Sequence, residues 1–415
     1  MMRLRNAAVL ETIFRTQGNF TRGASPSPKR WNGIEAAPFK DNAPAACCIS
    51  ADFEMGWGWR SLAPSAAEAM GAKERLHVPL ILGLLEEYSI PITWATVGHL
   101  FLESCVRSHT GLAHASMPRP LSDGSWSGDW YAHDPCSSVR RAPSWYAPDL
   151  IQRIVECKTP QEIGTHSFSH VNFSAGCSSR EVVERELETC LEVMRPLGMR
   201  PSTLVFPRNR AEYAYSPLLA GAGIIAVRHR ERERGIRLAY PERTPHGVYK
   251  IYESMNLRIA RHYDYLQKAR IFLCKAIERH AAYSLWFHPS DPAEWFDPQL
   301  RDILQYIADE RRGGRLWVAT IRDVAAYCEA REQLHVAAER SEHALTVSLR
   351  STLDVSRYGA PEVTLLIPAR SRPHSAHLEL TTGERQPVAV RFLADGAPRL
   401  LVNVPSTART LRLAF

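Results

Sequence analysis

Short apolar runs alternate with amphipathic helical segments between residues 44 and 330. One helical segment, residues 65–87, carries Leu76, Leu80 and Leu84 on one face, and another, residues 179–197, begins at a capping Ser179. Strands that alternate with helices predict an α/β fold, either a parallel barrel or a doubly wound sheet. In such folds active sites lie at the carboxyl ends of the strands. We expect strands at residues 46–52, 91–97, 162–166, 203–207, 223–227, 283–288 and 315–319.

The chain divides into three regions. Residues 1–43 hold most of the excess positive charge, with seven Lys or Arg against two Glu in the first forty residues, and we expect a disordered basic tail. Residues 44–335 form the predicted α/β domain, with a Ser-, Gly-, Pro- and Trp-rich insertion at 108–148 whose aromatic residues favour an ordered lid. In residues 336–415 apolar and polar positions alternate between turns, which predicts a small all-β, sandwich-like domain.

Composition argues against several classes of function. The net charge of +7 arises mainly in the tail, and the mixed-sign run at 228–237 is expected to be an exposed loop, so nucleic acid is not an expected partner. No apolar run reaches the roughly 20 residues that span a bilayer, and the first twenty residues lack a secretory signal pattern. The nine cysteines form no C-x-x-C pair, which indicates reduced thiols. We therefore expect a cytoplasmic protein, and the oligomeric state stays open.

Polar side chains gather where the predicted strands end. Asp52 and Glu54 are two residues apart on an extended segment, so both carboxylates point to the same side. His166 and His170 follow the third apolar run, and His288 ends the sixth. Like charges raise each other's pKa, and a divalent cation removes that penalty. Glu54, His166 and His170 are therefore candidate ligands, with Asp52 as the base that deprotonates a metal-bound water.

Each of these signals also has a simpler structural interpretation when it is taken alone. Asp52 would then cap a loop, Glu54 would face solvent, and the two histidines would lie on the surface. His288 is followed by Pro289 at a strand end, which suits a general acid, although a single histidine there is more often structural. Taken together, the two carboxylates and the histidine pair favour the functional interpretation.

The motifs at these strand ends resemble those of the polysaccharide deacetylase superfamily, also called the NodB homology domain or carbohydrate esterase family 4. The resemblance covers residues 44–330 and implies a distorted (β/α) barrel of seven units. It also implies metal-dependent hydrolysis of an N-acyl amide or O-acyl ester, usually on a sugar, with zinc as the typical ion and cobalt, nickel, manganese or iron as alternatives. The motifs read Asp52-Phe53-Glu54, His166-Ser-Phe-Ser-His170, Phe206-Pro207-Arg208-Asn209 and Leu285-Trp286-Phe287-His288-Pro289. The roles that the resemblance implies are a base at Asp52, metal ligands at Glu54, His166 and His170, and an acid at His288.

The chain departs from the family pattern in three places. The second acidic residue is Glu54, after one intervening residue, where the family commonly has an adjacent Asp. Arg208, the candidate for the arginine that steers Asp52 during catalysis, follows its proline, whereas the family's arginine usually precedes it. No counterpart of the family's acidic or tryptophan motif is found near residues 223–230.

Aromatic residues near the strand ends are compatible with a sugar substrate, because flat rings stack on the apolar faces of pyranoses. Ordinary packing in a core or a lid is an equally good interpretation for each ring. The candidate substrate-binding residues are Trp57 and Trp59, Trp130 and Tyr131 in the insertion, and Asn209 beside Arg208.

The sequence thus predicts a metal-dependent deacylase that acts on an acylated sugar or glycoconjugate intermediate. Two alternatives stay open. One is a metal-free amide hydrolase of the allantoinase-like kind, and the other is a carbohydrate-binding protein that has lost turnover. Neither the acyl group nor the glycan is specified by the patterns found here.

Overall fold

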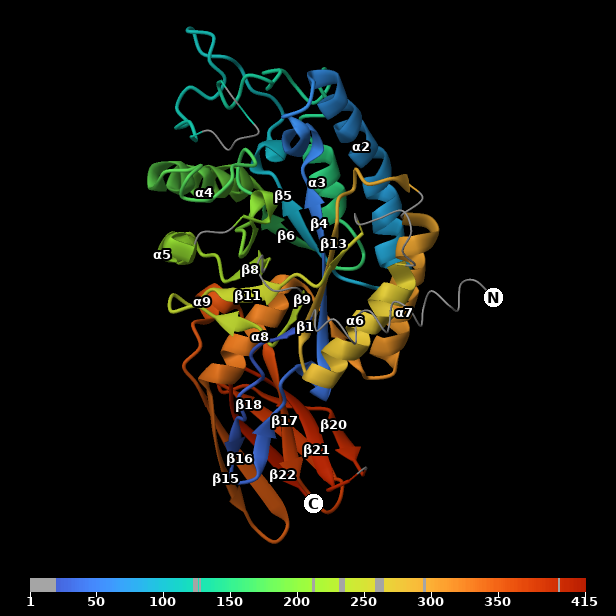
Figure 1. Ribbon diagram of the computed structural model, residues 1–415. Coiled ribbons are helices and arrows are strands. Elements are labelled where there is room, and N and C mark those ends of the chain that lie inside the picture. The colour runs from blue at the N-terminus through green and yellow to red at the C-terminus, as the bar shows by residue number, and fades with distance from the viewer. Residues whose placement is uncertain are drawn as a thin grey trace, which may run out of the picture.

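A parallel β-sheet that closes into a barrel forms the upper part of the molecule in Figure 1. The computed structural model describes residues 20–121, 126, 128–210, 213–230, 236–257, 265–293, 296–394 and 396–415. β11 pairs with β8 at one edge of the sheet, and β12, which follows β11 after Glu253 and Ser254, pairs with β13 at the other. This segment closes the barrel, so the predicted distorted barrel is confirmed. The strands, in their order around it, are β11 (Tyr249–Tyr252), β8 (Ala226–His229), β7 (Thr203–Val205), β6 (Glu162–Thr165), β5 (Thr93–Thr96), β4 (Ala45–Phe53), β13 (Ala282–Phe287) and β12 (Met255–Asn256).

The seventh barrel strand differs from the one that the apolar runs predict. The run at 315–319 does form a strand, β14 (Leu316–Val318), but it pairs only with the start of β4. The closing segment is β11 with β12, which the sequence did not indicate because Glu253 and Ser254 interrupt its apolar pattern. β10 (Glu242–Arg243) extends β11 in the antiparallel direction, and β1 (Phe20–Arg22) pairs with β9 (Ile236–Leu238) outside the barrel.

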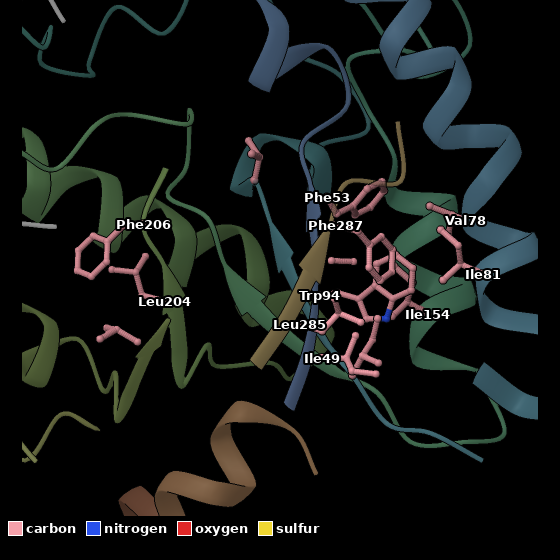
Figure 2. Close-up of a cluster of buried hydrophobic side chains, with 14 of the residues drawn as sticks. Ile49, Phe53, Val78, Ile81, Trp94, Ile154, Leu204, Phe206, Leu285 and Phe287 are labelled. Atoms are coloured by element: carbon pink, nitrogen blue, oxygen red, sulfur yellow. The ribbon is translucent and has the colours of Figure 1, made fainter. Parts of the chain in front are cut away.

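Alternation along β4 divides its side chains between the outside and the interior of the barrel. Ile49 and Phe53 point outward, into the apolar cluster of Figure 2 that also holds Val78 and Ile81 of the helix α2 (Pro64–Glu87). Ser50 and Asp52 point to the opposite face, into the barrel, where both contact Arg228 of β8. Burial of one such apolar side chain stabilises the fold by roughly 1.5–3 kcal/mol. The outward residues therefore fix the register that brings Asp52 into the interior.

Helices cover the outside of the barrel, and α8 covers the N-terminal ends of its strands, where Ile321 N donates to Thr93 Oγ1. The buried face of α2 is not the one expected, because Leu76 and Leu80 are 70% and 60% exposed. This helix has apolar residues on two stripes, and the stripe of Val78, Ile81 and Leu85 is the one that packs on the sheet. The other helices are α3 (Pro148–Val155), α4 (Arg180–Met194), α5 (Ser216–Gly221), α6 (Tyr265–Arg279), α7 (Arg301–Arg312), α8 (Ile321–Gln333) and α9 (Val355–Tyr358).

Two antiparallel sheets form the small β domain at the lower end of Figure 1, beyond the N-terminal ends of the barrel strands. The tail contributes to it, since β3 pairs with β17 and buries Ile34 and Ala36 in the sandwich core. The predicted disordered tail is therefore wrong for residues 20–22 and 30–36, whose short strands carry too little periodicity to be recognised in the sequence. Residues 1–19 lie outside the described residues. One sheet holds β15 (Leu334–Arg340), β16 (Ala344–Ser351), β22 (Ala408–Ala414), β18 (Ser375–Leu380) and β19 (Arg385–Pro387), and the other holds β2 (Arg30–Trp31), β3 (Ile34–Ala36), β17 (Glu362–Pro368), β21 (Arg399–Pro405) and β20 (Val390–Leu393).

The insertion lies at the opposite end of the barrel from the β domain, between η3 (Gly98–Phe101) and α3. Isolated bridges join its residues Ser138 and Ala113 to Ser104 and Arg107, which precede it. Before α3 its described part contains no strand or helix. Residues 122–125 and 127 lie outside the described residues. Turns, isolated backbone hydrogen bonds such as that from Leu121 N to the Cys177 carbonyl oxygen, and side-chain contacts therefore order the insertion. None of the helices that the structure describes has the length and apolarity needed to cross a membrane.

Candidate metal centre and active site

Residues from three strands meet at the carboxyl end of the barrel. Asp52 lies at the end of β4 and Glu54 directly after it, His166 and His170 follow β6, and His288 follows β13. Glu54 Oε1 is the central atom, at 3.0, 3.1 and 3.6 Å from the Nε2 atoms of His166, His170 and His288. All five residues are at most 5% exposed. The structure thus brings together every predicted ligand, the predicted base and the predicted acid.

The orientation of His166 fits a metal ligand. Its Nδ1 lies 2.7 Å from the carbonyl oxygen of Val205, which can only accept, so Nδ1 donates to it. Nε2 points at Glu54 Oε1, at a distance of 3.0 Å. These two atoms are placed to bind one divalent cation, and His170 Nε2 supplies a third ligand. Two imidazoles and one carboxylate suit zinc or another divalent transition metal and leave positions open for water.

The electrostatics of the centre distinguish His170 from His288. Burial lowers the pKa of His170 to about 4, so its ring is neutral at pH 7, as a metal ligand must be. Burial also lowers the pKa of His288, but the facing Glu54 carboxylate, together with Asp291 and Asp52, raises that pKa to about 10. The same histidines, against the effect of burial, hold the pKa of Glu54 well below its usual range. These acidic neighbours thus favour the protonated form of His288, which suits a proton donor.

The carboxylate of Asp52 is held by Arg228, not by Arg208. The Arg228 guanidinium donates from NH1 to Oδ1 at 2.6 Å and from NH2 to Oδ2 at 2.7 Å, a two-pronged contact that also fixes the carboxylate plane. Burial raises the pKa of Asp52, but Arg228 outweighs it and holds that pKa below the ordinary value. Asp52 is therefore ionised and fixed in orientation.

Two predictions about arginines are wrong, because Arg228 and not Arg208 holds Asp52. Arg208 was the candidate to steer Asp52, but it is exposed in η5 (Pro207–Asn209), a turn that leaves the barrel wall after β7. The run at 228–237 was expected to be an exposed loop, but Arg228 and His229 belong to β8, and Arg228 is buried inside the barrel. Residues 231–235 lie outside the described residues.

Arg228 is itself fixed from several sides. Ser50 Oγ accepts from its NH1 and Asn209 Oδ1 accepts from its NH2, each at 3.0 Å. Its guanidinium also lies 4.5 Å from the centre of the Trp286 ring, within the range of a cation–π contact. Asn209 therefore positions the arginine that holds Asp52, and a contact of Asn209 with substrate stays a prediction.

Left-handed backbone conformations gather in the loops around the centre. Non-glycine residues in this region cost about 1–3 kcal/mol each, and they persist at functional sites where the surrounding structure enforces them. Three loops that meet here, after β4, β6 and β7, each contain at least one. They are Met55, Ser167, His170, Arg208 and Asn209, with φ values of 52°, 59°, 59°, 58° and 52°.

Comparison with known proteins identifies the fold. No protein-family model and no curated protein sequence matches the chain. A solved Mycobacterium smegmatis structure, assigned as a polysaccharide deacetylase, matches 78% of this chain and 99% of its own, with a TM-score of 0.50 and 16% identity. The chain has the polysaccharide deacetylase fold.

Two other solved structures match less of the chain. A family 4 carbohydrate esterase from Streptomyces lividans, in complex with acetate, is 10% identical, with a TM-score of 0.32, and the match covers 65% of this chain and 90% of its own. A pseudoenzyme of the same family from Bacillus anthracis is 11% identical, with a TM-score of 0.36 and coverage of 68% and 66%.

Most of the predicted sugar-binding aromatic residues are instead buried in the polysaccharide deacetylase fold. Trp57 is 1% exposed and donates to the Trp145 carbonyl oxygen, and Trp130 and Tyr131 are 4% and 1% exposed. The prediction that these three rings stack on substrate is wrong, because the insertion folds down on the barrel and covers them. Trp59 is half-buried, with its ring centre 5.9 Å from that of His288, so it stays a candidate.

Two neighbours of Glu54 were not expected from the sequence. Glu74 of α2 accepts from the backbone N–H of Glu54 at 3.2 Å and of Met55 at 2.9 Å. Burial raises the pKa of Glu74 to about 8. Gly58 lies so close to Glu54 that a Cβ atom on it would be 1.7 Å from Oε2. The acidic residue on a helix face and the W-G-W-R sequence were weak signals of these roles.

The loop that carries His170 is held by residues that are distant in sequence. Glu186 of α4 accepts from Ser169 N at 2.8 Å and from Ser169 Oγ at 2.6 Å. The guanidinium of Arg60 donates to the carbonyl oxygens of Ser169 and His170. Trp130 of the insertion donates to Ser169 Oγ at 3.0 Å and lies under Arg60, with 3.4 Å between the guanidinium carbon and the ring centre. The insertion is therefore a wall of the site.

Proposed function

We propose that the chain is a metal-dependent hydrolase that removes an N-acyl or O-acyl group from a sugar or glycoconjugate. The proposal is carried by the convergence of Glu54, His166 and His170, beside the ionised Asp52 and the protonated His288. These groups are the ligands, base and acid that acyl transfer to water requires. The polysaccharide deacetylase fold supports the same assignment.

The three ligands and the base divide the first half of the reaction. Glu54, His166 and His170 would hold one divalent ion, most simply zinc, with cobalt, nickel, manganese or iron as alternatives. When bound, such an ion polarises an acyl carbonyl and lowers the pKa of a coordinated water. Asp52 removes the proton of the attacking water, and its two-pronged contact with Arg228 keeps the carboxylate ionised and aimed.

His288 serves the second half of the reaction, in which the leaving group departs. Its Nε2 lies 3.6 Å from Glu54 Oε1, so the proton that it carries faces the same centre. As the bond from the acyl carbon to nitrogen or oxygen breaks, His288 donates that proton to the leaving amine or alcohol. Trp59 lies beside His288 and offers a partly exposed ring on which the sugar can stack.

The first experiment is the metal content of the purified protein and of two histidine variants. We expect His166→Ala to lose one equivalent of divalent metal and His335→Ala, an exposed histidine of β15, to lose none. Acylated sugars are then screened for release of the free acid, with Asp52→Asn as the inactive control. Hydrolysis that is undiminished when both His166 and Asp52 are replaced refutes the proposal. Sugar binding without product, under any metal, favours a binding protein, and activity in metal-free protein favours the metal-free hydrolase.

The cellular location is a separate proposal. A cytoplasmic enzyme would act on an intermediate of glycoconjugate synthesis, whose acylated amino sugars offer amide bonds to this chemistry. Fractionation of cells that carry a tagged, full-length chain tests the location, and activity on nucleotide- or lipid-linked acylated sugars tests the substrate class. If the chain is found only outside the cytoplasm, the proposed location is wrong, and the proposed hydrolysis reaction is not affected.

A further inference from the structure

A second cluster of metal-ligating side chains lies at the base of the insertion and shares no residue with the centre described above. His99 comes from η3, and Cys105 lies just before the insertion. His114 lies in the first part of the insertion and Asp134 in its later part. One ligand atom from each of the four residues lies within 4.8 Å of the other three. The residues are far apart in sequence, so the fold has brought them together.

His99 presents a nitrogen without a hydrogen-bond partner to this cluster. The ring is fully buried, and its Nδ1 lies 3.3 Å from the carbonyl oxygen of Trp145, which can only accept, so Nδ1 carries the proton of the neutral ring. Nε2 makes no hydrogen bond to any described residue and lies 3.3 Å from Asp134 Oδ2. Leaving a buried polar atom without a hydrogen-bond partner lowers the stability of the fold. A cation between this lone pair and the carboxylate satisfies both.

The other distances suit four ligands around one ion. Asp134 Oδ2 lies 2.8 Å from His114 Nε2 and 3.5 Å from Cys105 Sγ. Ligands bound tetrahedrally to zinc lie roughly 3.3–3.8 Å from one another, given zinc–ligand distances of about 2.0–2.3 Å. Small side-chain rotations would therefore complete the coordination. Imidazole, thiolate and carboxylate are also the ligand types that zinc prefers.

We propose that His99, Cys105, His114 and Asp134 bind a structural zinc ion that fastens the insertion to the barrel. As the zinc–sulfur bond forms, the thiol proton of Cys105 leaves to solvent. The thiolate and the Asp134 carboxylate then balance the two positive charges of the ion, so the buried site is neutral as a whole. Four protein ligands leave no position for water, which makes the site structural and not catalytic.

The site is connected to the active-site loops on two sides. His99 N donates to the carbonyl oxygen of Phe168, within the loop that carries both histidine ligands, at 2.9 Å. The centre of the His99 ring lies 4.3 Å from that of Trp57, in the loop that follows Glu54. Zinc at this position would therefore fix the base of a wall whose other end, Trp130, contacts Ser169.

The test is the metal stoichiometry of the full-length protein and its variants, measured by mass spectrometry of the elements after dialysis. Wild type is expected to hold two equivalents, Cys105→Ser and His114→Ala one each, and a double Cys105→Ser, His166→Ala variant none. Cys274→Ser, which changes an exposed thiol of α6, is the matched control and keeps two. The side chain of His114 is 13% exposed, so it lies at the edge of the cluster. Its replacement therefore gives a second measurement of the same site if Cys105→Ser does not fold.

Spectroscopy gives a readout that needs no variant. Protein produced in cobalt-supplemented medium is expected to show a thiolate-to-cobalt charge-transfer band, which is lost in Cys105→Ser and unchanged in Cys274→Ser and His166→Ala. Wild type with at most one equivalent, all of it lost in His166→Ala, overturns the second site and leaves the catalytic proposal standing. Metal that is lost in Cys105→Ser but not in His166→Ala supports the second site and contradicts the catalytic proposal. Absence of the thiolate band in cobalt-loaded wild type also overturns the inference.

Discussion

Replacing Arg228 with Met tests whether the buried ion pair positions Asp52. Met is similar in length to the Arg stem but cannot supply the donors that lie 2.6 and 2.7 Å from the two oxygens of Asp52. It also removes the contacts with Ser50 and Asn209 at 3.0 Å. The side chains of Arg228 and Asp52 are 0% and 4% exposed, so loss of these donors leaves a buried carboxylate without its charged partner.

The expected loss of stability follows from these contacts. Two of the four hydrogen bonds join charged groups, and such bonds contribute about 1.5–3 kcal/mol each. Removal of one partner from a buried ion pair costs about 3–5 kcal/mol, which agrees with that sum. In the double variant Asp52→Asn, Arg228→Met no carboxylate is left unpaired. We therefore expect the double variant to be more stable than Arg228→Met alone, with a coupling free energy of about 2 kcal/mol or more.

Urea unfolding of wild type, both single variants and the double variant gives this coupling free energy. Arg228→Lys keeps the charge but lacks the two-pronged geometry, so it should recover only part of the stability and of kcat. Metal content should stay unchanged in every variant, because Arg228 does not contact Glu54, His166 or His170 among the described contacts. A coupling free energy below about 0.5 kcal/mol, or full activity in Arg228→Met, would refute the reasoning.

Four further predictions concern other parts of the chain. Gly58→Ala should lower metal affinity by about 10-fold or more, since a Cβ 1.7 Å from Glu54 Oε2 displaces that ligand; unchanged metal titration would contradict this. Burial raises the pKa of Glu162 in the folded state, so its ionisation costs stability as pH rises from the ordinary carboxyl range. Glu162→Gln should therefore gain unfolding free energy relative to wild type as pH rises above the ordinary carboxyl range of about 4, and a difference that does not change with pH would count against it. Trp59→Ala should raise KM for a sugar substrate roughly threefold to tenfold with a smaller change in kcat, and an unchanged KM would exclude stacking. Ile34→Ala should lower the unfolding free energy by about 2–5 kcal/mol because the side chain is 2% exposed in the sandwich core, and a neutral effect would show that β3 does not dock there.

The five central residues of the site could be predicted because each stands at the end of an apolar run. In a parallel barrel all carboxyl ends lie on one rim, so Asp52, Glu54, His166, His170 and His288 converge without any knowledge of how the strands are ordered. The i, i+2 spacing of the carboxylates and the i, i+4 spacing of the histidines are local features, and the backbone preserves them. Local pattern and rim position together were sufficient.

The partner of Asp52 could not be predicted because it depends on closure of the barrel. Arg228 is on β8, which faces β4 across the interior only when β11 and β12 bridge β8 to β13. In the sequence Arg228 begins a run of alternating charges, which is typical of an exposed loop. Arg208, in contrast, stands in a recognisable motif but leaves the barrel wall in a turn. A local pattern does not report which face of a closed sheet a residue occupies.

The aromatic residues were misplaced for a related reason. Trp57, Trp130 and Tyr131 are near the rim in sequence, and a ring near a rim is equally compatible with sugar stacking and with burial. Burial is decided by the insertion, whose described part has almost no regular hydrogen bonding and is instead ordered by contacts such as Trp130 to Ser169. Such contacts have no periodicity, so no sequence pattern could reveal them.

The two clusters of ligands follow one physical rule, and ligand number separates their expected functions. In each, a histidine whose Nδ1 contacts a backbone carbonyl oxygen, that of Val205 for His166 and that of Trp145 for His99, directs its Nε2 at a carboxylate oxygen 3.0 or 3.3 Å away. Each geometry is suited to a cation bound between the ring nitrogen and the carboxylate. Three ligands on the barrel rim leave room for water and substrate, whereas four ligands at the base of the insertion leave none. The same pairing of imidazole and carboxylate can thus serve catalysis at one site and hold the wall of that site at the other.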